Sequence, residues 1–319
     1  IFFESNHKAN EKKYAREVLM KFMRRAWRRE IAEVEIDQKL ALFSKLRPQC
    51  NDFQEAMIEV LATVLSSPKF LYLVLASEPE NEGNQRISDF ELASRLSFFL
   101  WSSSPDAELL DLAANGRLRD PIVIKEQTRR LLADPKADRF SRHFTRQWLG
   151  LELLDFLKVD NKAYRHFDPL LMDGMREEPV AFFNEVLKRN RSVMDFLDSD
   201  YVMVNDRLAR HYDLPEVVGD DLRSVKLPPE DRRGGVLTQA GLLAMNSDGK
   251  DSHPLKRGIW LLENLLNDPP PPPPPAVPEI DLADPEILKL TLKQRMEDHR
   301  NDPACISCHV KIDPWGIAF

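Results

Sequence analysis

Two of the three cysteines in this chain lie one helical turn apart, directly before a histidine. The stretch ACISCHVKIDPWGIAF contains Cys305, Cys308 and His309. At this spacing two thiols can form thioether bonds to the two vinyl groups of a porphyrin, and the adjacent histidine can bind the iron from one face. The motif therefore predicts covalently attached haem c, with His309 as the proximal iron ligand.

The residues after His309 can enclose such a group. Apolar side chains that can cover a porphyrin are those of Ile312, Trp315, Ile317 and Phe319. We expect a turn at Asp313 and Pro314, where a backbone carbonyl can accept the second ring N–H of His309. Ile312, Pro314 and Trp315 are therefore predicted to belong to the haem site.

The other axial position of the iron has three candidate ligands. Met245 offers a thioether sulfur, while His253 and His299 offer imidazole nitrogens. Each of these residues also has an ordinary alternative, a core position for the methionine and a hydrogen-bonding position for the histidines. An open axial position is a further alternative, and it would favour small-molecule chemistry over plain electron transfer.

The same cysteines allow other chemistry. A zinc site could use Cys305, Cys308, His309 and His299, although adjacent residues bind one ion with awkward geometry. A redox-active or purely structural cysteine pair is a third alternative, but no βαβ pattern surrounds the motif as in thioredoxin-like proteins.

A second stretch could hold an anion. Arg232 and Arg233 precede two glycines and an expected helix, where a group such as a haem propionate could sit. A turn followed by a helix start is the simpler interpretation of these residues.

Composition excludes some partners. The chain has 52 acidic and 45 basic residues and a net charge of −7, so we expect no nucleic-acid partner. No apolar run is long enough to predict a transmembrane segment. The chain begins at Ile1 without a methionine and stops at Phe319, ten residues after His309, so we expect that both ends are cut and that the lack of a signal peptide is uninformative.

Helical periodicity dominates the chain and predicts an all-α, multi-helix array. In REVLMKFMRRAWRREI the apolar residues recur every three to four positions. Ser88 lies three residues before Glu91, which predicts a helix start, and Gly116 is placed to end a helix in the left-handed conformation. Other expected helices include MVNDRLARHYDL and PEILKLTLKQRMEDHR, and LRSVKLP is the one modest strand candidate.

The helices are expected to form several modules. We predict an N-terminal helical module over 1–80, a central one over 81–212 and a third over 213–268. A polyproline strap over 269–278 then leads to a short haem-binding segment over 279–319, truncated at its end. The strap is expected to act as a rigid spacer or to lie over the helical body, and a ligand for a proline-binding domain is the alternative.

With these features, the chain resembles the multidomain cytochrome-c-associated proteins of planctomycetes, whose modules are mostly domains of unknown function. The resemblance covers almost the whole chain. It rests on stretches that include FMRRAWRREIAEVEID, LSSPKFLYLV, ELASRLSFFLWSSSPDAELLDLA, RGGVLTQAGLLAMNS and HRNDPACISCHVKIDPWGIAF. It implies haem attachment at Cys305 and Cys308, ligation by His309, and location in the periplasm or cell envelope. It supplies no reaction and no catalytic residue.

Three functions follow as hypotheses. The first is an exported c-type haem protein that transfers electrons within a larger multidomain redox protein and meets a redox partner protein. The second is a haem-dependent oxidoreductase or peroxidase-like enzyme with a substrate pocket between the helical body and the C-terminal segment. The third is a cell-envelope scaffold in which the cysteines hold zinc or form a disulfide.

Overall fold

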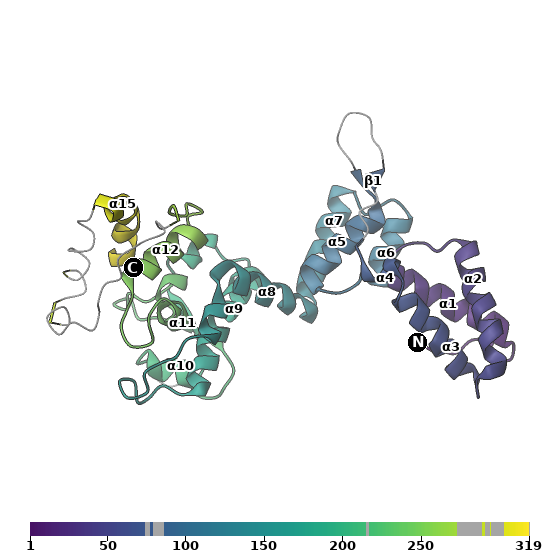
Figure 1. The fold of residues 1–319 in the computed structure, drawn as a ribbon, viewed down its shortest axis with the longest axis horizontal. Helices are drawn as coiled ribbons and strands as arrows, with labels where there is room; N and C mark the ends of the chain where they lie inside the picture. Colours follow the sequence, from purple (N-terminus) through teal and green to yellow (C-terminus); the bar gives the residue numbers. More distant parts are fainter. Residues whose placement is uncertain are drawn as a thin grey trace. The chain divides into compact units, whose positions relative to one another are not determined.

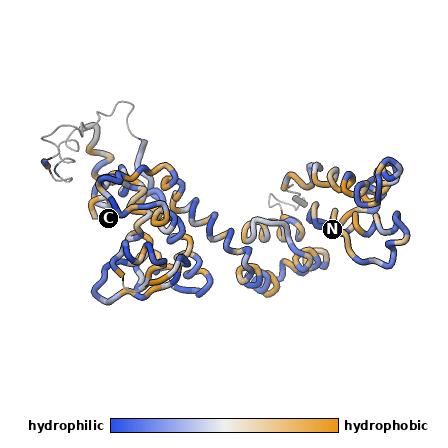
Figure 2. Tube along the Cα trace, turned by 90° about the horizontal axis from the view of Figure 1, so that it is seen from below, coloured by the Kyte–Doolittle hydropathy of each residue, from blue (hydrophilic) through white to orange (hydrophobic). Residues whose placement is uncertain are grey.

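The computed structural model describes residues 1–73, 77–78, 86–214, 217–272, 289–290, 294 and 303–318. In these ranges the chain is predominantly α-helical, which confirms the predicted fold class. It forms two compact units, Ile1–Phe140 and Ser141–Phe319 (Figure 1). Hydrophobic and hydrophilic residues alternate along the helices of each unit (Figure 2), as expected for helices that bury one face. The finer division into modules stays a prediction.

The first unit contains two helical clusters with separate cores. Its elements are α1 (Glu11–Trp27), α2 (Glu33–Leu46), η1 (Arg47–Gln49), α3 (Phe53–Leu65), α4 (Pro68–Leu71), β1 (Ser77–Glu78), β2 (Arg86–Ile87), α5 (Asp89–Trp101), α6 (Ala107–Ala114), α7 (Pro121–Ala133) and η2 (Pro135–Ala137). Leu19 and Val60 belong to the core of the first cluster, whereas Leu100 and Leu131 belong to that of the second. Strands β1 and β2 pair antiparallel.

The predicted boundary signals of the second cluster are confirmed. The Ser88 hydroxyl accepts the backbone N–H of Glu91 and caps α5. Gly116 has a φ of +65° just after α6, a conformation that glycine adopts without strain. At the other end of α5, the indole Nε1 of Trp101 donates to the carbonyl of Leu131 at 2.9 Å. This bond ties α5 to α7 inside the core.

The second unit carries the cysteine motif. Its elements are the larger part of α8 (Asp138–Leu149), η3 (Leu151–Asp155), α9 (Pro169–Arg189), η4 (Val193–Phe196), β3 (Tyr201–Val204), α10 (Asp206–His211), β4 (Arg223–Lys226), η5 (Val236–Thr238), α11 (Ala240–Met245), α12 (Pro254–Asn264) and α15 (Pro303–Ala318). Its largest core cluster includes Leu149, Phe182, Tyr201 and Trp260. The indole of Trp260 donates to the carbonyl of Leu149 at 2.9 Å, which fixes α12 against the end of α8.

One predicted helix begins too early. Met203 and Val204 were expected to be helical, but they lie in β3, which pairs antiparallel with β4 and is buried along its whole length. Helix α10 begins only at Asp206, because the Asn205 side chain accepts the N–H of Leu208 and caps it. The strand candidate LRSVKLP is confirmed as β4. β-branched residues explain the outcome, since they favour a strand wherever a partner is present.

Several sequence-based predictions concern residues that the structure does not describe. Most of the helix expected in PEILKLTLKQRMEDHR, the polyproline strap from residue 273 onward and His299 lie outside the described residues. Residues 269–272 are neither helix nor strand. Among the helices of the described ranges, none has the length and apolar character needed to cross a membrane.

Candidate haem-attachment site

The cysteine motif lies in the first half of α15. Cys308 is a free thiol and partly exposed, and the backbone of Cys305 precedes it by one helical turn in the same helix. This spacing brings the two positions to the same side of α15, as thioether attachment to one porphyrin requires. In the described part of the chain, no cluster of three or more His, Cys, Asp or Glu side chains is arranged to hold a metal ion. The Cys305 side chain and His299 lie outside that part, so the zinc alternative stays open.

His309 is held by a carboxylate on its own helix. Its Nδ1 lies 2.8 Å from Oδ1 of Asp313, one turn further along, and the two residues are only 6% and 3% exposed. A carboxylate oxygen accepts, so Nδ1 carries the ring proton. The other ring nitrogen, Nε2, then has the lone pair with which an imidazole binds iron. We expected a backbone carbonyl as the acceptor, whereas the structure supplies the Asp313 side chain.

The expected turn at Asp313 and Pro314 is wrong, because α15 continues through Pro314 to Ala318. Proline has no N–H and normally disturbs the interior of a helix. Here the helix is held from outside by close packing on α12. A Cβ atom on Gly316 would lie 2.0 Å from the carbonyl oxygen of Pro254, and one on Gly258 would lie 2.5 Å from the carbonyl oxygen of Ile312. Only glycine at both positions permits this approach.

Polar contacts at two further points join α15 to the rest of the second unit. The Arg257 guanidinium donates to the carbonyl of Gly316 at 3.2 Å. Lys311 pairs with Asp268 at 2.6 Å and donates to the carbonyl of Pro269 at 3.3 Å. The second contact reaches the first proline of the strap, so α15 is fixed next to the place where the strap begins.

The predicted porphyrin-covering residues differ in their surroundings. Ile312 is 4% exposed and packs toward α12, whereas Pro314 is exposed and Trp315 is 44% exposed. Cys308 and Trp315 are seven residues apart and therefore lie on the same flank of the helix. We call this side of the helix the Cys308–Trp315 flank. It borders the buried face of α15 and is partly exposed to solvent. The donor types and the partly exposed thiol of Cys308 fit a covalently attached haem. Because His309 is buried, its ring must be uncovered to reach an iron atom.

Two of the three candidate axial ligands, Met245 and His253, lie within the described residues. Met245 is 6% exposed and belongs to the core cluster around Trp260. His253 caps the start of α12, where its Nδ1 accepts the N–H of Lys256 at 3.4 Å, and burial lowers its pKa. Because Pro254 contacts Gly316, His253 lies toward the C-terminal end of α15, about two turns from His309. In this arrangement His253 and His309 do not meet.

Sequence reasoning missed the Asp313 carboxylate and a second buried acid, Glu178. The i, i+4 spacing of His309 and Asp313 would have signalled their contact if the helix had been extended beyond the motif. Glu178 is 1% exposed and pairs with Tyr212 at 2.6 Å. No local pattern links these two residues, because Glu178 lies in α9 and Tyr212 directly follows α10, 34 positions further along the chain.

Three protein-family models match the chain in sequence order. PSD5, a protein of unknown function (DUF1595), matches residues 14–74. PSD4, a protein of unknown function (DUF1592), matches residues 87–214. PSCyt3, a protein of unknown function (DUF1588), matches residues 233–319 and so includes α12, α15 and the cysteine motif. No curated protein and no solved structure matches.

Proposed function

Because the chain belongs to the planctomycete-type multidomain cytochrome-c-associated proteins, we propose that it is an exported c-type haem protein. In this proposal Cys305 and Cys308 attach the haem and His309 binds its iron. The protein transfers electrons within a larger multidomain redox protein and to a redox partner. The observation that carries the proposal is the attachment motif on α15, followed by an imidazole whose Nδ1 is already engaged by Asp313.

The Asp313 carboxylate has a definite role in this proposal. When it accepts the Nδ1 proton, it fixes the orientation of the His309 ring and makes Nε2 more basic. A more basic axial ligand stabilises the oxidised iron and lowers the reduction potential. When bound, haem supplies the one-electron chemistry, and the protein sets its potential through this carboxylate and through burial of the site.

The packing of α15 suits an electron carrier. Gly258 and Gly316 bring α12 and α15 into backbone contact, and the Lys311 and Asp268 pair adds a second attachment. Apart from the movement that uncovers the His309 ring for the iron, these contacts keep α15 in place in both oxidation states. The Cys308–Trp315 flank is the exposed side through which a partner would approach the porphyrin.

Location in the periplasm or cell envelope is part of the proposal, since c-type haem is attached outside the cytoplasm. The test is to express the chain in a host with the c-type maturation apparatus and to record a pyridine haemochrome spectrum after denaturation. We expect a c-type signal that disappears in the double variant Cys305→Ala, Cys308→Ala. Cys50→Ala is the matched control, because Cys50 lies in the first unit, and it should keep the full signal.

The same preparation can overturn the proposal. Zinc without iron in the purified protein, under conditions in which a control cytochrome is matured, would favour the scaffold function instead. A haem signal that survives the double cysteine variant would mean that the haem is not held by this motif.

A further inference from the structure

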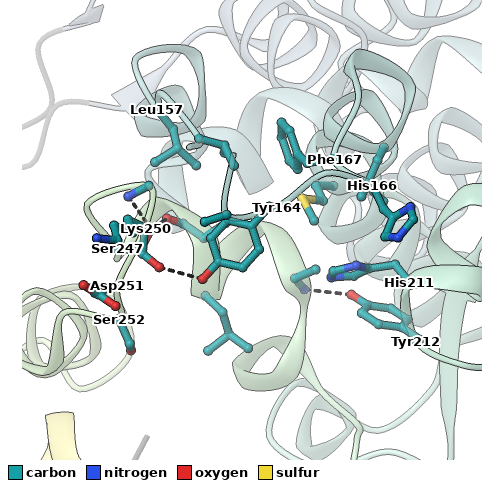
Figure 3. Close-up of a pocket in the computed structure, with 18 of the residues that line it drawn as sticks. Leu157, Tyr164, His166, Phe167, His211, Tyr212, Ser247, Lys250, Asp251 and Ser252 are labelled. Atoms are coloured by element: carbon teal, nitrogen blue, oxygen red, sulfur yellow. Dashed lines mark hydrogen bonds between the residues drawn. The ribbon is translucent and has the colours of Figure 1, made fainter. Parts of the chain in front are cut away.

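The second unit contains a cavity of about 590 Å³ whose lining residues lie between Leu157 and Arg257 (Figure 3). They come from the segment before α9, from α9, from the end of α10, from the segment of Arg233 and η5, from α11, and from the loop before α12 together with α12 itself. Tyr164 stands between the two sides of the cavity, with the loop that contains Ser247 and Lys250 on one side and His166 and His211 on the other. The Tyr164 hydroxyl donates to the carbonyl of Lys250 at 2.6 Å, which ties the sides together. The cavity is therefore built by several converging elements.

The cavity is mainly apolar inside. Residues that supply this surface are Leu157, Phe167, Leu171, Met175, Leu243 and Ala244. Its volume falls within the range of about 300–1,000 Å³ that is typical of small-molecule sites. Such sites usually combine an apolar lining with a few polar groups that fix the orientation of the ligand.

One of those polar groups is the guanidinium of Arg233. It lies over the ring of Tyr212, 4.3 Å from the ring centroid, and its Nε is buried without a hydrogen-bond partner. Within the described residues no carboxylate forms an ion pair with it. The Tyr212 ring is itself fixed, because its hydroxyl accepts the N–H of Ala240 at 2.7 Å and contacts Glu178 at 2.6 Å. Arg233 is thus a rigidly supported cation that faces an apolar space.

The nearest buried acid does not neutralise Arg233. Burial raises the pKa of the Glu178 carboxyl to about 8, so at neutral pH this group is mostly protonated. Other basic residues that line the cavity are Arg165, Lys250 and Arg257, against a single acidic one, Asp251. The Arg233 side chain is partly buried and its buried Nε has no hydrogen-bond partner, an unfavourable arrangement that an anionic ligand would relieve.

The two glycines after Arg233 have a separate, structural role. Gly235 has a φ of +67°, and a Cβ atom there would lie 2.6 Å from the carbonyl oxygen of Leu197. A Cβ atom on Gly234 would lie 2.2 Å from the carbonyl oxygen of Ser199. The glycines let the chain pass close to the segment before β3, and this passage positions Arg233 at the cavity.

We propose that this cavity binds a small amphipathic carboxylate, with its apolar body among Phe167, Met175 and Leu243 and its carboxylate paired with Arg233. The proposal does not depend on haem, because no residue of α15 is among those that define the cavity. It also differs from the sequence-based hypothesis of a pocket between the helical body and the C-terminal segment, since the cavity lies within the body.

The test uses a fluorescent fatty acid, 11-(dansylamino)undecanoic acid, and its methyl ester, titrated against the full chain. The two probes share one apolar body and differ in charge. We expect the acid to bind saturably and the ester to bind with a Kd that is about tenfold higher or more. This factor corresponds to the loss of one charge-assisted hydrogen bond. Equal affinities of acid and ester would overturn the proposal, and this comparison needs no variant protein.

Two arginine variants locate the anion. Arg233→Gln should weaken binding of the acid by about tenfold or more and leave binding of the ester unchanged. Arg232→Gln is the matched control, because Arg232 is its exposed neighbour and does not line the cavity. The affinity of Arg232→Gln for the acid should stay within about twofold of that of the unmodified chain. An equal loss in both variants, or none in Arg233→Gln, would contradict the assignment.

Discussion

Asp313 and Glu178 are both nearly inaccessible to solvent, yet they stand beside different partners in the second unit. Asp313 contacts the imidazole of His309, whereas Glu178 contacts the phenol of Tyr212. An imidazole can take up a proton or bind a metal near neutral pH. Burial and the neighbouring Glu178 carboxyl raise the pKa of Tyr212 well above its usual value, so this phenol does neither.

Burial of an acid therefore does not by itself mark a reactive site. Glu178 and Tyr212 form a neutral hydrogen-bonded pair that supports the wall of a cavity, beneath Arg233. Asp313 instead orients the imidazole of His309, directly after the two cysteines of the C-x-x-C-H motif.

The substitution Gly316→Leu should separate α15 from α12. Because a Cβ atom at this position would lie 2.0 Å from the Pro254 carbonyl oxygen, we expect the docked state to lose about 3 kcal/mol. Hydrogen–deuterium exchange should then rise along residues 303–318. Ile317→Ala, at a neighbouring position that is 46% exposed, should leave exchange nearly unchanged. Unaltered protection in Gly316→Leu would show that the two helices do not depend on this contact.

Glu178 should make the second unit less stable as the pH rises. Its folded-state pKa of about 8 lies above its ordinary value of 4.5, so the folded state binds more protons between these values. The free energy of unfolding should therefore fall from about pH 5 to pH 8, by about 1 kcal/mol or more, and level off above. Glu178→Gln should remove this slope in urea unfolding followed by circular dichroism. Its neighbour Glu177, which is partly exposed and pairs with Arg142, serves as the control in the variant Glu177→Gln. A slope that persists in Glu178→Gln would assign the effect elsewhere.

Asp313→Asn should raise the reduction potential of the haem-loaded protein. The amide keeps an acceptor oxygen for His309 Nδ1 but lacks the charge that makes Nε2 more basic. In the protein without haem, loss of the charged acceptor should cost about 1 kcal/mol of stability. Asp268→Asn serves as the control, because Asp268 pairs with Lys311 and not with His309. Equal potentials in the parent protein and Asp313→Asn would mean that Asp313 does not act on the iron.

Removal of the Lys311 side chain should have the smallest effect. The Lys311 and Asp268 side chains are 34% and 64% exposed, so their ion pair contributes less than about 1 kcal/mol to stability. Lys311→Ala should raise exchange of α15 slightly in low salt and not at all in high salt, where the pair is screened. A large effect that persists in high salt would indicate that packing of the lysine stem matters more than its charge.

Local signals in the sequence predicted much of this structure. The cap at Ser88, the left-handed Gly116 and the position of the cysteine motif on a helix depend only on neighbouring residues. Features that depend on distant partners were not predictable. Strand β3 needs β4 beside it, and α15 passes Pro314 because it packs on α12 through Gly258 and Gly316. The cavity at Arg233 joins segments from Leu157 to Arg257, which no local pattern relates.

The most direct test of the central claim is to map the haem to its peptide. Protein made with the c-type maturation apparatus would be denatured, digested with trypsin and measured by mass spectrometry. We expect the peptide NDPACISCHVK, which contains Cys305 and Cys308, to carry the mass of one haem. The same peptide found entirely unmodified, while a control cytochrome in that host is matured, would contradict the assignment of α15 as a haem-attachment helix.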